Sequence, residues 1–291
     1  MAIRTFPSDP NDLSSAPPLV SGLARDIEII ELLATAESWD SGGLGVSRIA
    51  QITSRDKGQI SRCLKTLLAA GLVDRDSMTR RYRVGIRFYS IALQTQEAFL
   101  VMVSQRFLLE AVAFTQESAH LNILRGSHLQ TLRTEEARTP LRDATWDGRI
   151  LRAIDTASGR AILATFTQRE LKDWFEEHQN PVEAVELKIV EGSSPQITTY
   201  RRLSDELAAV RERGYAIVNG EFAAGVVDAA AAISDGAGRV VGAISVGMPE
   251  AKVGSQFAQL GLVVARVAQD FSRELGGSPF MRDAGAFDLA P

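Results

Sequence analysis

Cysteine and histidine are scarce in this chain. It has one cysteine, Cys63, and three histidines among 291 residues. A single cysteine excludes an internal disulfide and fits a reducing compartment such as the cytoplasm. The histidines, His120, His128 and His178, show none of the HExxH-type spacings of metal enzymes. We therefore expect no metal site and no cofactor, and we expect Cys63 to pack in a core rather than to react.

Other signatures of catalysis and of membranes are also missing. Ser158 lacks a G-x-S-x-G turn, no P-loop is present, and the glycines of 220–225 do not fit G-x-G-x-x-G. No apolar run approaches membrane-spanning length, and the first residues lack a signal-peptide pattern. We expect no catalytic residues and no membrane partner, and an enzyme is the weaker hypothesis.

Positive charge, by contrast, is concentrated in one stretch. Residues 47–87 hold ten Lys/Arg and three Asp/Glu, a net of +7, whereas the whole chain carries −4. The same stretch predicts a helix, a tight turn, a second helix ended by Gly71, and a short hairpin. Ser54 or Asp56 would cap the second helix. Apolar residues recur at helical spacing in both helices: Val46, Ile49, Ala50 and Ile52 in the first, and Ile60, Cys63, Leu64, Leu67 and Leu68 in the second.

The face opposite those stripes is polar and basic, and this indicates double-stranded DNA as a partner. Lys and Arg reach phosphates and guanine, and Gln reaches adenine. A compact basic module on an acidic chain favours a polyanion met at one surface. The alternative is a solvated helix face beside a loop. The candidate DNA-binding residues are Ser47, Lys57, Gln59, Ser61, Arg62, Lys65, Arg80 and Arg81.

The flanking segments complete the first domain. Residues 1–20 are rich in proline and predict a mobile tail. A helix starting at Ser21 and running to Ser38, with Ile27, Ile30, Leu33 and Ala34 on one face, would pack under the helix-turn-helix. Residues 21–86 then form a winged helix-turn-helix domain.

A long helical pattern follows, from Ile86 to Phe114, and residues 87–105 are predicted as a linker helix. Its part from Phe99 to Val103 is apolar nearly all round, so it must be buried. Burial against a second copy of the chain or packing onto the following domain would each satisfy this requirement.

Residues 106–276 predict an α+β domain with a mostly antiparallel sheet flanked by helices, and 277–291 a tail. The segment 235–238, Asp-Gly-Ala-Gly, predicts a hairpin turn. The expected strands are 118–124, 130–133, 215–218, 226–234 and 239–247, and the expected helices are 156–166, 168–178, 200–213 and 252–275.

At this point the chain resembles the IclR family of bacterial transcription regulators, from about Ser21 to Gly276. The matching stretches are SGLARDIEIIELLA, VSRIAQITSRDKGQISRCLKTLLAAGLV, RRYRVGIRFYSIA, TASGRAILA, DELAAVRERGYAI and GVVDAAAAISDGAGRVVGAISVGMP. The resemblance implies a winged helix-turn-helix, a linker helix and a GAF-like domain that binds a small organic effector, commonly a carboxylic acid or aromatic catabolite. It also implies dimers or dimers of dimers on palindromic operators, acting as repressors or activators.

The resemblance also implies an effector pocket at the start of the TASGRA helix, beneath the central strands. Ser158 and Gly159 would lie at a helix N-terminus, where free N–H groups favour an anion. Alternatively, they are a cap and a close-packing glycine. The effector-binding positions carried over are Ala157, Ser158, Gly159, Val218, Asn219, Asp228, Ser245 and Gly247.

The sequence departs from the family pattern at three places. The loop 217–221 is usually rich in acids but here reads Ile-Val-Asn-Gly-Glu, Ile154-Asp155 stands where a histidine is common, and Asp228 replaces a small or thiol residue. These departures suggest an unusual ligand or a site that has lost its ligand. Asp228 would either stay charged, pairing with a cationic or hydroxyl-rich ligand or with an upstream arginine, or be protonated and donate to a ligand carboxylate. It could also face solvent or cap a turn. The upstream arginines are Arg142, Arg149 and Arg152.

Three functional hypotheses remain open from the sequence. The first is a DNA-binding regulator that senses a metabolite. The second is a DNA-binding regulator whose C-terminal domain only oligomerises, and the third is a small-molecule enzyme.

Overall fold

The computed structural model describes residues 22–138, 150–178, 197–221, 223–254 and 257–277. The chain divides into two compact units, Met1–Ala98 and Phe99–Pro291. The two predicted tails and the start of the first helix at Ser21 lie outside the described residues.

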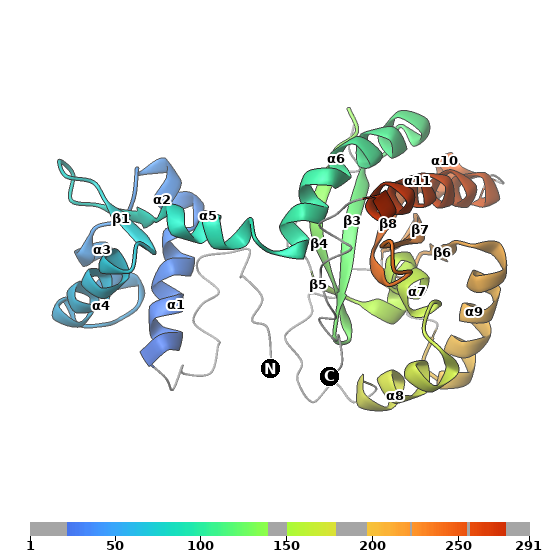
Figure 1. The fold of residues 1–291 in the computed structure, drawn as a ribbon, viewed down its shortest axis with the longest axis horizontal. Coiled ribbons are helices and arrows are strands. Elements are labelled where there is room, and N and C mark those ends of the chain that lie inside the picture. The colour runs from blue at the N-terminus through green and yellow to red at the C-terminus, as the bar shows by residue number, and fades with distance from the viewer. Residues whose placement is uncertain (1–21, 139–149, 179–196, 222, 255–256, 278–291) are drawn as a thin grey trace. The chain divides into compact units, whose positions relative to one another are not determined.

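Four helices precede the hairpin in the first unit (Figure 1). The predicted first helix is interrupted, because the backbone of Thr35 is extended and its hydroxyl donates to the Leu32 carbonyl at 2.8 Å. Continuity through Ser38 was therefore a wrong prediction. The helices are α1 (Gly22–Leu33), α2 (Ala36–Asp40), α3 (Val46–Ile52) and α4 (Lys57–Ala69).

The apolar stripes of these helices meet in one small core. Ile49 and Leu64 are fully buried there, with Ile29 of α1. Leu68 and Ile27, which were predicted on the buried faces, are 38% and 45% exposed. These predictions were wrong, as was that for Ala34, because the buried face of α1 is centred on Ile29–Leu33 and Leu68 lies at the margin of the buried face of α4. Cys63 is partly buried and donates to Asp26, and burial raises its pKa to about 12, as expected for an unreactive thiol.

The turn and the hairpin follow the sequence signals closely. Asp56, and not Ser54, caps α4 by accepting from the backbone N–H groups of Gly58 and Gln59, at 2.8 and 3.2 Å. Gly71 ends the helix with φ +70°, a left-handed conformation that glycine adopts without strain. The hairpin pairs β1 (Val73–Arg75) with β2 (Tyr82–Val84), and α5 (Ile86–Ala92) follows it.

A six-stranded antiparallel sheet forms the centre of the second unit. Its strand order is β5-β4-β3-β8-β7-β6, and every pairing is antiparallel. The predicted α+β class with an antiparallel sheet is confirmed, although the short strand β5 was missed. The strands are β3 (Ala119–Arg125), β4 (His128–Glu135), β5 (Ile150–Arg152), β6 (Ala216–Asn219), β7 (Val226–Ser234) and β8 (Val240–Pro249).

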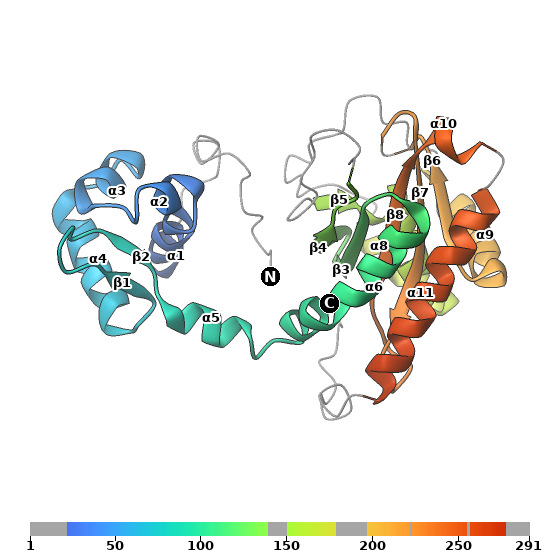
Figure 2. The same cartoon turned by 90° about the horizontal axis from the view of Figure 1, so that it is seen from above.

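Helices cover both faces of this sheet and create two cores. On one face α6 (Gln96–Thr115) and α11 (Phe257–Gly277) lie side by side (Figure 2). The rings of Phe107 and Phe271 stack there with their centroids 4.5 Å apart. The second core lies on the other face, under three helices and a 3-10 turn. These are η2 (Ala153–Asp155), α7 (Ala157–Leu163), α8 (Gln168–His178) and α9 (Tyr200–Arg213).

Two long helices predicted from the sequence are broken in the structure. The pattern from Ile86 to Phe114 is divided between α5 and α6 by a turn at residues 93–95. The predicted helix 252–275 is preceded by the separate short helix α10 (Glu250–Val253), which ends at Gly254 with φ +54°. Periodicity alone did not reveal either break, because the apolar spacing continues across both.

The apolar character of α6 is greater than the sequence reading allowed. Among the described residues, this one helix is long and apolar enough to cross a membrane, judged by length and composition alone. In the structure, 28% of its most apolar 18-residue stretch is buried. The statement that no run approaches membrane-spanning length was therefore wrong. Its buried residues, among them Leu100 and Leu108, pack in the core that α6 shares with α11. Packing onto the following domain thus buries Leu100, but Met102 is 66% exposed, so the expectation that all of 99–103 is buried was wrong for the single chain.

Candidate functional site

The polar face of α4 is exposed, as is the hairpin beside it. All eight candidate DNA-contacting side chains are accessible to solvent, including Lys57, Gln59 and Arg62 at the start of α4. Arg81 also donates to the Ser41 carbonyl, which fixes its side chain against the turn after α2. Arg80 lies in the hairpin loop with φ +60°. The first turns of α4 and the basic hairpin loop are therefore both accessible to a partner.

Part of the positive charge of this stretch is compensated within the unit. Arg48 pairs with Glu37 at 2.6 Å, and Arg55 pairs with Glu28. Both acids lie outside residues 47–87, so the charge count of the sequence did not include them. Arg75 and Arg83, which were not among the candidates, are exposed on the hairpin strands and add to its basic surface.

The second unit holds a buried polar cluster where α7 begins beneath the sheet. Asp228 of β7 is 7% exposed, and its Oδ2 accepts from the backbone N–H of Ala157 at 3.2 Å. Burial raises the pKa of Asp228 to about 7, opposed by the Ala157 N–H, the Arg160 charge and the Ser245 hydroxyl. Both protonation states of this carboxyl are therefore accessible near neutral pH.

Asn122 of β3 connects the cluster. Its Nδ2 donates to Ser158 Oγ at 2.9 Å and to Ser245 Oγ at 3.1 Å. Its Oδ1 accepts from the Thr131 hydroxyl at 2.8 Å. These partners fix the amide orientation and hold the two serines together beneath α7.

A buried ion pair lies one helical turn along α7. Arg160 is 3% exposed, its two terminal nitrogens donate to the two carboxylate oxygens of Glu221, and its Nε donates to the Ile154 carbonyl at 2.8 Å. Asp155 of η2 is also buried. It pairs with Arg152 at 3.4 Å, and burial raises its pKa. The region around α7 thus contains three buried carboxyl groups and one buried guanidinium.

Two family models match this chain. The one described as "Bacterial transcriptional regulator IclR C-terminal" matches residues 93–273, and the "IclR helix-turn-helix domain" matches residues 22–77. The chain belongs to the IclR family.

Curated relatives of this IclR-family chain are transcription regulators. The HTH-type transcriptional regulator BhcR of Paracoccus denitrificans is 27% identical over 268 residues, covering 91% of this chain and 90% of BhcR. The repressor AllR of Escherichia coli K12 is 24% identical over 256 residues, covering 87% of this chain and 90% of AllR. The protein is a DNA-binding transcriptional regulator and not an enzyme.

Solved IclR structures share the fold. The IclR protein of Thermotoga maritima gives a TM-score of 0.65 at 23% identity and covers 87% of this chain and 98% of its own. An IclR homolog from Microbacterium hydrocarbonoxydans, complexed with 4-hydroxybenzoate, gives a TM-score of 0.65 at 18% identity and covers 87% and 100%.

The structure brings together only part of the effector set implied by the family resemblance. Ala157, Ser158, Asp228 and Ser245 lie in one cluster, and Val218 and Gly247 are the sheet neighbours of Asp228. Asn219 is exposed at the end of β6 and donates to Glu250 at 2.9 Å.

The cap of α7 is Thr156, whose hydroxyl accepts from the Gly159 N–H at 3.2 Å, so the interpretation of Ser158 as a cap was wrong. The interpretation of Gly159 as a close-packing glycine is confirmed, because a Cβ there would lie 2.0 Å from the Ala153 carbonyl oxygen.

The structure tests two expectations for Asp228, namely that it faces solvent and that it pairs with an upstream arginine. It is buried, so the interpretation that it faces solvent was wrong. Of the upstream arginines offered as partners, Arg152 pairs with Asp155, while Arg142 and Arg149 lie outside the described residues.

Sequence reasoning missed Asn122, Thr131 and the Arg160–Glu221 pair of this IclR-family chain. The signal available for Asn122 was one amide within the otherwise apolar strand segment Leu121–Leu124. His120, on the same strand, is buried against Thr134, and burial lowers its pKa to about 4, as expected of a packed histidine. No cluster of His, Cys, Asp and Glu able to hold a metal occurs in the part of the chain that the structure describes.

Proposed function

We propose that this IclR-family regulator senses a small organic metabolite, a carboxylic acid or an aromatic catabolite, through its second unit. The observation that carries the proposal is the buried cluster of Asn122, Ser158, Asp228 and Ser245 beneath α7. Buried polar groups usually satisfy one another or a ligand, and here several converge at one point between helix and sheet. The solved homolog with 4-hydroxybenzoate supports an aromatic acid as one candidate class.

The effector site proposed comprises Ala157, Ser158, Gly159, Val218, Asp228, Ser245 and Gly247. Asn219 is a weaker member because its amide contacts Glu250 at the surface. Asn122 joins the proposal as the residue that positions both serine hydroxyls.

The test is a calorimetric titration of the full chain with a panel of carboxylic acids and aromatic catabolites that includes 4-hydroxybenzoate. Operators are first selected from random duplexes, and each binding compound is then assayed on the DNA complex. We expect one compound to bind and to change operator affinity. Ser245→Ala should weaken the binding of that compound without changing the affinity for DNA when the compound is absent. Binding by no panel member would favour the alternative regulator, whose second unit only oligomerises.

On DNA, we propose that Lys57, Gln59 and Arg62 at the start of α4 read base edges. Ser61 and Lys65 of α4 and Ser47 of α3 contact the DNA backbone, and Arg80 and Arg81 of the hairpin hold phosphates or the minor groove. All eight side chains are exposed, which supports contact with DNA, and the division between bases and backbone follows the chemistry of the residue types. A role on bacterial DNA supports a cytoplasmic location, which we propose for this protein.

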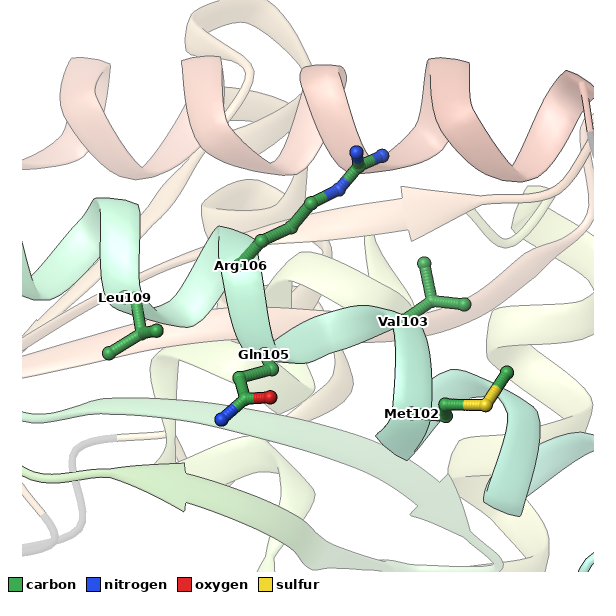
Figure 3. A pocket seen from close by; sticks show the side chains of 5 residues that line it. All are labelled: Met102, Val103, Gln105, Arg106 and Leu109. Atoms are coloured by element: carbon green, nitrogen blue, oxygen red, sulfur yellow. The ribbon is translucent and has the colours of Figure 1, made fainter.

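Self-association is the other proposal, because one winged unit reads too short a site for genomic specificity. A shallow groove on α6 is lined by Met102, Val103, Gln105, Arg106 and Leu109 (Figure 3). Met102 and Leu109 are 66% and 48% exposed, so this side of the apolar helix offers a surface for a second copy of the chain.

The structure changes which substitutions test the dimer. Leu100 is 2% exposed in the core with α11, so Leu100→Asp would report on folding. Met102→Glu with Leu109→Glu should instead lower the mass measured by light scattering, while Leu262→Glu, at another exposed apolar position, should not. A monomeric wild-type protein at micromolar concentration would contradict the proposal.

A further inference from the structure

A polar pocket of about 500 Å³ opens over the Arg160–Glu221 pair in the second unit. Its lining comes from α7, from α9 and the residue Ile197 shortly before it, and from the connection between β6 and β7. The lining residues are Arg160, Ile197, Arg202, Asp205, Glu206 and Glu221.

At the base of this pocket, Arg160 forms a binding site for one carboxylate, and the side chain of Glu221 occupies that site. Both terminal nitrogens of Arg160 donate to the Glu221 carboxylate, and Nε is held by the Ile154 carbonyl. The guanidinium is therefore fixed in a buried position, with its fork directed at one carboxylate. An oriented, desolvated guanidinium of this kind binds a carboxylate far better than an exposed one does.

The other charged groups of the pocket are arranged around this pair. Arg202 of α9 places a second guanidinium in the lining. Glu206 is neutralised by Arg213 at 2.7 Å, and Asp205 is exposed at the rim, where solvent screens it. Asp155 and Asp228, both buried, interact electrostatically with Arg160 from outside the lining. Arg202 is exposed as well, so once Glu221 is displaced the least screened charge in the lining is the buried guanidinium of Arg160.

We propose that this pocket binds the carboxylate of a small organic acid at Arg160, and that Glu221 is a resident competitor which the ligand displaces. The exchange replaces one bidentate Arg–carboxylate pair by another, so the number of charge-assisted bonds to Arg160 is kept. Its cost is that of moving Glu221 into solvent and of ordering the acid, and contacts to the other lining residues must offset it. The inference rests on the proposed sensing function and names a site separate from the cluster around Asp228.

Displacement also has a structural consequence. Glu221 follows Gly220 at the end of β6, and its bond to Arg160 ties the β6–β7 connection to α7. A bound acid breaks this tie, so ligand occupancy releases the end of β6 from the helix. The pocket thus couples binding to a change in one defined connection of the fold.

The experiment uses benzoate as the probe and benzamide as its uncharged analogue, titrated into the full chain by ligand-observed NMR. Glu221→Gln removes the competing charge, and we expect benzoate to bind about tenfold or more tightly than to the wild type. Asp205→Asn makes the same charge change at the rim, and we expect it to alter affinity by less than about threefold. Benzamide should bind Glu221→Gln no more tightly than it binds the wild type.

The double variant Arg160→Gln/Glu221→Gln keeps the two side chains similar in size without burying an unpaired charge, and it should lose benzoate binding. Its circular dichroism and urea unfolding confirm that it is folded. Amide exchange over Ala216–Glu221 should rise when benzoate binds the wild type. Equal benzoate affinity of Glu221→Gln and wild type, or binding retained by the double variant, overturns the inference.

These outcomes separate the inference from the proposed function. If a panel compound changes operator affinity while Glu221→Gln leaves benzoate affinity unchanged, the sensing function stands and this site does not. If benzoate binds as expected but no panel compound affects DNA binding, the site stands and its regulatory role does not.

Discussion

In the first unit the side chains assigned to DNA are exposed on α4 and the hairpin, whereas in the second the polar side chains around α7 are buried and bonded to one another. Lys57 and Arg62 are accessible to solvent, but Asp228 and Arg160 are 7% and 3% exposed. A DNA-contacting residue needs only the right type on the right helix face. A buried polar residue needs partners, and these come from strands and helices far apart in the sequence.

This difference predicts unequal consequences for the same chemical change. Arg160→Met leaves Glu221 buried without its partner and should destabilise the second unit by about 3–5 kcal/mol. Arg48→Met breaks the exposed pair with Glu37 in the first unit and should leave the unfolding midpoint unchanged. Urea unfolding followed by hydrogen exchange distinguishes the two units. Recovery of stability in Arg160→Met/Glu221→Leu would show that the loss comes from the unpaired charge.

Asp228→Asn tests whether the buried cluster responds to pH. Because the pKa of Asp228 rises from 3.8 to about 7, the folded state keeps a proton that the unfolded state loses between these values. Stability should therefore fall as pH rises from about 4 to 7 and stay level above, with an upper limit of about 4 kcal/mol.

Asp228→Asn removes the titrating carboxyl, so the difference between the stability–pH curves of the wild type and the variant isolates the contribution of Asp228. The comparison is needed because His120, whose pKa is lowered to about 4, contributes the opposite slope in the same range. A difference that is independent of pH would exclude titration of Asp228. In the presence of an effector, Asp228→Asn should also remove any pH dependence of binding across this window.

Gln59→Ala tests specificity at the exposed surface. We expect it to weaken operator binding by about 1–3 kcal/mol and to relax the sequence preference, because Gln59 lies exposed near the start of α4. Competition with random duplexes provides the measurement. An equal loss on operator and random DNA would place Gln59 on the backbone.

Arg81→Ala should have the smallest and most uniform effect. It removes one phosphate contact, so binding to all duplexes should weaken similarly and the slope of log K against log salt should fall by about one. Because Arg81 also donates to the Ser41 carbonyl, Arg81→Lys is the control that keeps the charge. A loss confined to the operator would contradict the expected role.

Much of the first unit could be predicted from local signals. Asp56 as a cap and Gly71 as a helix end act within one or two turns of the backbone, so their chemistry is visible in the sequence. The break at Thr35 was missed because the apolar spacing continues through Ala34, although the backbone of Thr35 is extended and its hydroxyl donates to the Leu32 carbonyl. The pairing of Arg48 and Arg55 with acids on other helices was missed for a related reason, since both partners lie outside the basic stretch.

For the second unit, the sequence by itself determined the antiparallel sheet and most of its helices, and the family resemblance suggested the start of α7 as the place of an effector site. Apolar strand runs, a strong turn at Asp235–Gly238 and glycine at helix ends are local features of the sequence. Only the tertiary structure placed Asn122 between Ser158 and Ser245, made Thr156 the cap of α7 and closed Arg160 on Glu221. Burial obliges each polar group to find a partner, and Glu221 lies 61 residues from Arg160, at a distance over which neither periodicity nor charge counting can pair side chains.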